Sequence, residues 1–202
     1  MQDAYIVSAL RTPIGKKKGS LSSMHPADLG AAILSATFDR VDLDPGLVED
    51  VIFGCVDTVG PQAGDIARTC WLAAGLPEHV PGTTVDRQCG SSQQAVHFAS
   101  QAIMSGTADV VIAGGVQNMN MIPISYAMLA GQALGFDDPF SGSTGWVKRY
   151  GNQEVSQFNS AQMIAEKWKI SRAEMESFAF ESHQKARRAI NAKHFVDEIV
   201  PI

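Results

Sequence analysis

The sequence lacks the features that mark membrane-spanning, nucleic-acid-binding and disulfide-bonded proteins. No stretch approaches the ~20 consecutive apolar residues of a membrane span, and the N-terminus enters a strand-like run directly, so we expect no signal peptide. The net charge of −5 gives no reason to expect nucleic-acid binding. The three cysteines are an odd number without metal-ligand spacing. We therefore expect reduced thiols, no metal site and a cytoplasmic location.

The residues that are present predict a soluble α/β protein. The 202 residues are 45% hydrophobic and 18% charged, which is enough for one sizeable core and an appended subdomain. Strand-like runs occur at 4–10, 51–56, 83–87 and 109–113. They alternate with helical patterns that begin near positions 26, 65 and 90. This alternation predicts a parallel or mixed sheet with helices on both faces.

The pattern changes after position 120. Residues 121–150 are predicted to be irregular, and two helical patterns come after them. The first covers about 160–169, and the second opens with the capping box Ser171-x-x-Glu174. Residues 198–202 have the pattern of a short strand. We therefore predict two domains, residues 1–120 and residues 121–202.

Cys89 is the strongest catalytic candidate. It lies between a strand-like run and an amphipathic helical pattern that ends at Gly106. The first turn of a helix has unpaired N–H groups that favour the thiolate, which is the nucleophilic form. The alternative is a small buried hydrophobe, and that role is predicted for Cys55 and Cys70, which have apolar neighbours.

Two other features near Cys89 each have two interpretations. Gly114-Gly115 suits a tight turn that lets the backbone approach Cys89, and less well a loop that cradles phosphate. His97 resembles a base on the helix after Cys89. It is more than two helical turns away at 1.5 Å per residue, so we do not predict that role.

Several separated motifs resemble the thiolases, the acetyl-CoA acyltransferases that cleave or form 3-ketoacyl-CoA. They are Arg11-Thr12-Pro13-Ile14-Gly15, Val85-Asp86-Arg87-Gln88-Cys89-Gly90-Ser91-Ser92, the turn Ala113-Gly114-Gly115-Val116-Gln117-Asn118-Met119, and the helix from Ser171 to His183. They fall in the family's order along the whole chain. The residues before Cys89 most resemble those of actinobacterial thiolases that degrade acyl-CoA and steroids.

The resemblance implies a fold and a chemistry. The fold would be the N-terminal βαβαβ half of a thiolase, followed by part of a mostly helical loop domain that covers CoA and helps to form a homodimer or homotetramer. Cys89 would attack the 3-keto carbonyl, form an acyl-cysteine and use its own N–H as an oxyanion donor. Coenzyme A and acyl-CoA would be substrates, with no tightly bound cofactor. Ser156, Gln157 and Phe158 would lie in the pantetheine region.

The sequence departs from the family's pattern beyond the loop domain. The motifs Asn-Glu-x-Phe, Gly-His-Pro and a second Cys-x-Gly do not occur. In the family they include the histidine that activates the nucleophile and the cysteine that moves the α-proton. We therefore expect that the C-terminal half is missing from this chain. We also expect that the chain is inactive alone, because a nucleophile without its base loses most of its rate.

Three interpretations stay open. In the first, the chain is the N-terminal part of a degradative thiolase, and its chemistry is complete only in the intact chain or with a complementing polypeptide. Alternatively, it is a non-catalytic thiolase-like protein that only dimerises or binds acyl-CoA weakly. A ketoacyl synthase of the same fold is a more distant option, and the Arg11-Thr12-Pro13 motif argues against it.

Overall fold

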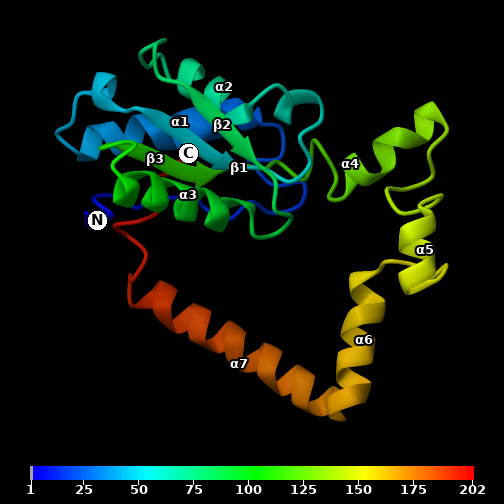
Figure 1. Ribbon diagram of the computed structural model, residues 1–202. Coiled ribbons are helices and arrows are strands. Elements are labelled where there is room, and N and C mark those ends of the chain that lie inside the picture. The colour runs from blue at the N-terminus through cyan, green and yellow to red at the C-terminus, as the bar shows by residue number, and fades with distance from the viewer. Residues whose placement is uncertain (1) are drawn as a thin grey trace. The chain divides into compact units, whose positions relative to one another are not determined.

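The computed structural model describes residues 2–202, which form two compact units (Figure 1). One unit runs to Gly135 and includes Glu198–Ile202, and the other is Phe136–Asp197. The chain therefore leaves the first unit and returns to it in its last five residues. The domain boundary expected at position 120 is not tested by this division into compact units, so it stays a prediction.

The first unit is built on a parallel sheet of three strands in the order β2-β1-β3. The strands are β1 (Asp50–Gly54), β2 (Gly82–Val85) and β3 (Val111–Gly115). Gly54 at the end of β1 is in register with the last residue of each neighbour, Val85 and Gly115. The carboxyl ends of all three strands consequently meet at one edge of the sheet.

Helices cover both faces of this sheet, as predicted. Helices α1 (Pro26–Arg40) and α2 (Ile66–Ala73) pack together on one face, and α3 (Ser91–Ser105) packs on the other (Figure 1). The period of two along β1 sends Val51 and Phe53 to the α1–α2 side and Ile52 to the α3 side. The α/β architecture with helices on both faces is therefore confirmed.

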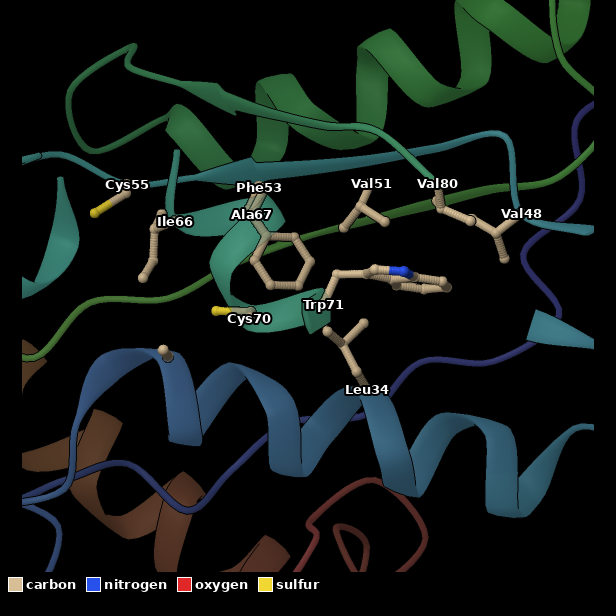
Figure 2. Packing of buried hydrophobic residues seen from close by; sticks show 11 residues of the cluster. Leu34, Val48, Val51, Phe53, Cys55, Ile66, Ala67, Cys70, Trp71 and Val80 are labelled. Atoms are coloured by element: carbon tan, nitrogen blue, oxygen red, sulfur yellow. The ribbon is translucent and has the colours of Figure 1, made fainter. Parts of the chain in front are cut away.

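The main core lies between β1 and α1. Figure 2 shows Leu34 reaching from α1 towards Trp71 of α2, with Val51 and Phe53 pointing from β1 into the same space. Trp71 is fully buried, and its indole N–H donates to Pro77 O at 2.8 Å. Burying side chains of this size contributes roughly 1.5–3 kcal/mol each, so this cluster holds the helices on their face of the sheet.

Local signals explain where the helices begin and end. The His25 side chain accepts from Ala27 N–H at the start of α1, where Pro26 is the first helical residue. Gly106 follows α3 with a φ of +75°, in agreement with the predicted helix end. Single-turn 3₁₀ helices η1 (Pro45–Leu47) and η2 (Gly60–Gln62) lie in the connections.

The predicted buried strand at residues 4–10 is wrong. Tyr5 and Val7 are 77% and 83% exposed, and the segment has no strand assignment. A strand needs a neighbour that accepts its backbone hydrogen bonds. Among the described residues, pairing with the chain end begins only after this segment, where Arg11 forms a bridge with Ile199 and an ion pair with Glu198 at 2.7 Å. The strand expected at 198–202 is likewise reduced to that bridge.

Residues 121–150 are less irregular than predicted. They contain α4 (Tyr126–Leu129), η3 (Ala130–Leu134) and α5 (Thr144–Tyr150). Ser143 caps α5 by accepting from Trp146 N–H, and the Trp146 ring lies 4.4 Å from Phe140 and 4.6 Å from Tyr150, between ring centroids. Aromatic contacts within the segment stabilise a short helix that periodicity does not reveal.

The second unit contains α5 and two longer helices, α6 (Gln157–Trp168) and α7 (Arg172–Asn191). The predicted capping box is confirmed, because Ser171 and Glu174 exchange side-chain and backbone hydrogen bonds. None of the residues in these three helices is buried, and Phe158 and Phe178 are 87% and 76% exposed. Within residues 2–202 no helix combines the length and apolarity needed to cross a bilayer.

Candidate active site

A cavity of about 280 Å³ opens in the first unit, at the carboxyl ends of β1 and β3 and beside the start of α3. Open parallel sheets commonly bind ligands at this edge. The lining comes from the end of β1, the turn before α3, the start of α3, the end of β3 and the segment that follows β3. The lining residues are Gly54, Cys55, Val56, Gln88, Cys89, Ser91, Ser92, Gly115, Val116, Gln117 and Ile124.

Cys89 is the exposed thiol of this cavity. It precedes α3 by two positions, and Gly90 at the N-cap offers no side-chain hydrogen bond to the first turn. The N–H groups of that turn therefore have no side-chain acceptor from the cap. The structure places Cys89 where the sequence predicts it, between a strand end and a helix start.

The other two cysteines are buried, in agreement with the predicted packing role. Burial raises the pKa of the Cys55 thiol to about 11, and the nearby Asp57 and Asp86 charges add to this rise. Burial likewise raises the pKa of Cys70 to about 12. Cys55 borders the cavity but belongs to the core cluster on the α1–α2 side of the sheet. Both thiols are therefore protonated and unreactive at neutral pH.

A strained turn delivers Cys89 to the cavity. Gly90 N–H donates to Arg87 O at 3.1 Å, which closes a turn whose second residue, Gln88, has a φ of +50°. Glycine is the usual residue at such a position, and a side chain there costs roughly 1–2 kcal/mol. The structure holds a non-glycine residue in this conformation directly before the candidate nucleophile, a pattern common at functional sites.

Two glycines let α3 approach the sheet edge closely. A Cβ atom on Gly54 would overlap the backbone of Ser91 and Ser92, and a Cβ atom on Gly115 would overlap the Ser92 hydroxyl and Gly54 O. The predicted turn at Gly114-Gly115 is wrong, because both residues belong to β3. The close backbone approach expected there exists, but it is to Ser92 in the first turn of α3 rather than to Cys89 itself.

A buried carboxylate supports the cavity wall, and it was not predicted from the sequence. Asp57 is 1% exposed and faces three donors. Its Oδ2 accepts from Gln117 Nε2 at 3.2 Å and from Ser125 N–H at 3.0 Å, and its Oδ1 accepts from Ala127 N–H at 2.9 Å. Asp57 thus fixes the cavity residue Gln117 and the start of α4.

Gln62 and Asn118 extend this buried network. Gln62 Nε2 donates to Asp57 O at 2.7 Å, and Gln62 Oε1 accepts from Asn118 N–H at 2.7 Å. The Asn118 amide donates to backbone carbonyls of the 21–24 segment, with the shortest bond, 2.8 Å, to Met24 O. The available sequence signal was the presence of polar residues soon after two strand-like runs. Asp57 follows the run at 51–56, and Gln117-Asn118 follow the run at 109–113 after three residues.

The predicted pantetheine residues lie in the second unit. Ser156 is the N-cap of α6 and accepts from Asn159 N–H at 3.5 Å. Gln157 is the first residue of that helix, and Phe158 is exposed. No contact tests their role, so the CoA assignment stays a prediction.

No titratable base lines the cavity. Of the residues that the structure describes, those that surround it include no histidine, carboxylate, lysine or arginine. His97 is an exposed residue of α3 and does not line the cavity either. Across residues 2–202, no cluster of three or more histidine, cysteine or carboxylate side chains is arranged to hold a metal ion.

Comparison with known proteins gives a consistent set of matches. Residues 4–202 match the N-terminal domain of thiolase. Over its whole length the chain is 57% identical to the steroid 3-ketoacyl-CoA thiolase FadA6 of Mycobacterium tuberculosis, of which it covers 50%, and 39% identical to a 3-ketoacyl-CoA thiolase of Aliivibrio salmonicida, again covering 50%. The crystal structure of the acetyl-CoA acetyltransferase of Bacillus anthracis superposes with a TM-score of 0.79 at 30% identity, with 100% of this chain and 51% of that one covered. The chain spans about half the length of the curated relatives that it matches.

Proposed function

The chain belongs to the thiolase family, and from that membership we propose that it carries the nucleophile of a 3-ketoacyl-CoA thiolase. The observation that carries the proposal is the placement of Cys89. Its thiol is the exposed one of three, and it borders a cavity at the carboxyl edge of a parallel sheet, on a strained turn before α3. A lone cysteine would support little, but a strand, a strained turn and a helix start together present this sulfur to a ligand-sized space.

The proposed reaction proceeds in two transfers. The Cys89 thiolate attacks the 3-keto carbon, and the bond between C2 and C3 breaks as the tetrahedral intermediate collapses. Acetyl-CoA leaves after its C2 carbanion takes a proton, and the acyl group stays on sulfur as a thioester. A second CoA thiolate then attacks the acyl carbon and releases Cys89, so the enzyme returns unchanged. The reverse sequence is the Claisen condensation.

Charge on the carbonyl oxygen needs donors during both transfers. We propose the backbone N–H of Cys89 as one of them, because the turn that presents the sulfur also fixes the orientation of this N–H. Such donors act best when they are rigid before the reaction starts. The register-paired glycines and the buried polar network around Asp57 supply that rigidity to the cavity walls.

The substrate class follows from relatives rather than from the cavity. The steroid thiolase that is 57% identical supports an acyl-CoA with a steroid-derived acyl group, and the 3-ketoacyl-CoA thiolases support fatty acyl chains. We propose CoA thioesters as the substrates in either case, with residues 121–202 as part of a CoA-covering domain and Ser156, Gln157 and Phe158 near the pantetheine. We further propose that the protein is a homodimer or homotetramer. We also propose a cytoplasmic location, since three free thiols fit a reducing compartment.

The cavity composition favours a second candidate for the chain on its own. Its lining contains no group that could take the proton of Cys89 or of the substrate. We therefore propose that residues 2–202 alone do not turn over substrate, and that the base and the second cysteine come from a complementing C-terminal thiolase half. Without such a half, the chain would only dimerise or bind acyl-CoA weakly.

A complementation assay tests both statements. The chain is mixed with the C-terminal half of the 57% identical thiolase, and the loss of 3-ketoacyl-CoA absorbance with free CoA is followed. We expect no turnover from either part alone and turnover from the mixture, which Cys89→Ala abolishes. Cys70→Ala is the matched control, because it removes a buried thiol outside the cavity. Turnover that survives Cys89→Ala would overturn the assignment.

A further inference from the structure

We propose that Ser91 is a positioning residue whose hydroxyl holds the strained Gln88 turn closed and thereby keeps Cys89 at the cavity. The inference rests on the proposed function only in treating Cys89 as the nucleophile. The sequence motif around Cys89 does not assign a task to this serine. Its role emerges from hydrogen bonds that cross the turn.

The Ser91 hydroxyl bonds to the backbone on both sides of the strained peptide. Its oxygen accepts from Arg87 N–H at 2.8 Å, and its O–H donates to Gln88 O at 2.5 Å. The backbone N–H of Ser91 also donates to Gln88 O, at 3.0 Å. One side chain therefore ties the residue before Gln88 to the carbonyl of Gln88 itself.

The side chain is well placed to act as a fixed anchor. Ser91 is 3% exposed and begins α3, which packs against β1 and β3. The glycine at position 54 lets the Ser91–Ser92 backbone sit directly on the sheet edge. The anchor is consequently part of the rigid helix–sheet body, whereas the turn residues 86–89 are exposed.

Other contacts support the turn without replacing the hydroxyl. Asp86 Oδ1 accepts from Gln88 N–H at 2.9 Å, and the Arg87 side chain donates to the buried Gln94 Oε1. Neither of these contacts involves the Gln88 carbonyl oxygen, to which the Ser91 hydroxyl donates. Without the Ser91 hydroxyl, Arg87 N–H loses its acceptor, and the left-handed conformation of Gln88 loses a restraint that opposes its relaxation.

Rescue by glycine separates a conformational lock from ordinary packing. Glycine adopts a φ of +50° without the penalty that glutamine carries. If Ser91 acts by holding Gln88 in that conformation, Gln88→Gly should restore what Ser91→Ala loses. A serine that merely filled space would not be compensated by this change, because glycine at position 88 adds no volume near position 91.

The experiment measures the alkylation rate of Cys89 by iodoacetamide at pH 8, followed by intact mass, in the 202-residue chain. Cys55 and Cys70 are buried and serve as internal unreactive thiols. We expect Ser91→Ala to slow the reaction about fivefold, equivalent to ~1 kcal/mol, because the sulfur moves away from the N–H groups of the first turn of α3, and a helix N-terminus stabilises nearby negative charge by up to about this amount. The Ser91→Ala/Gln88→Gly double variant should return to within about twofold of the parent rate, a difference well below one kcal/mol.

A second measurement on the same proteins keeps the result interpretable. Amide exchange at Arg87 should accelerate in both Ser91→Ala and the double variant, because both lack the acceptor hydroxyl. Ser100→Ala is the matched control, since the hydroxyl of this α3 serine contacts Met104 Sδ, at 3.6 Å, and the residue does not line the cavity. It should change neither measurement.

Two outcomes overturn the proposal. One is an unchanged or faster alkylation of Ser91→Ala when its far-UV circular dichroism matches the parent. The other is a slowed reaction that Gln88→Gly does not restore. Alkylation requires neither CoA nor a base from another polypeptide. The proposed thiolase activity can therefore fail while the role of Ser91 stands, and the reverse also holds.

Discussion

Gly54 and Gly115 are register partners on adjacent strands, and both lie against the first turn of α3 at Ser92. This contact joins the carboxyl edge of the sheet to the helix that comes after Cys89. Any side chain at either position must displace α3 or the strand. The position of the candidate nucleophile thus depends on the absence of a side chain at Gly54 and Gly115 as much as on the motif that contains the cysteine.

Gly115→Ala should lower the free energy of unfolding by roughly 1–3 kcal/mol, the usual cost of overpacking a tightly packed interface. Chemical denaturation followed by circular dichroism measures the change. Gly15→Ala is the matched control, because a Cβ atom there meets only Leu21 Cβ, at 3.9 Å. Equal stability of the two variants would show that the packing of α3 does not require a glycine at position 115.

Asp57→Asn should destabilise the first unit by roughly 2–3 kcal/mol. The carboxylate accepts three hydrogen bonds while almost fully buried, and an amide would turn its NH₂ group towards an N–H donor. Denaturation in urea measures the loss. Asp42→Asn, at an exposed position, should stay within about 0.5 kcal/mol of the parent, and a similar value for Asp57→Asn would contradict the anchoring role.

The stability of the chain should fall as the pH rises above about 9. Cys55 and Cys70 have folded-state pKa values near 11 and 12, raised by burial from 9.0, so between these limits the unfolded chain binds fewer protons than the folded chain. The slope is roughly 1.4 kcal/mol per pH unit for each thiol. Denaturation curves at pH 8, 9 and 10 should therefore show a loss that is smaller in the Cys55→Ala/Cys70→Ala variant. Identical slopes in the two proteins would refute the assignment to these thiols.

Asn118→Ala should release the basic loop before α1. The Asn118 amide donates to three carbonyls of residues 21–24, and Lys18 N–H donates to the neighbouring Asn120 Oδ1 at 2.8 Å. Loss of the three Asn118 bonds leaves the Lys18–Asn120 bond as a weaker tether and raises the fraction of chain in which the loop opens locally. Limited proteolysis with trypsin should cut at Lys16–Lys18 several-fold faster. Asn152→Ala, at an exposed position in the other unit, should leave that rate unchanged.

The family, the alternation of strands and helices, and the position of Cys89 could all be predicted from the amino-acid sequence. These features depend on local signals, since a period of two or 3.6, a glycine after a helix and a capping box act within a few residues. The ends of α3 and the Ser171 cap of α7 were predictable for that reason.

The contacts that support the site, and the places where local signals mislead, are visible only in the folded chain. Tyr5, Ile6 and Val7 have a strand-like pattern, yet a strand forms only beside a partner, and the described chain offers pairing no earlier than Arg11. Gln62 and Asn118 join one buried network although 56 positions separate them. Ser91 acts on Gln88 through hydrogen bonds that require the turn to be closed already. The first contact joins residues that only folding brings together, and the second depends on a turn conformation that Gln88 seldom adopts, so a periodic sequence pattern contains neither.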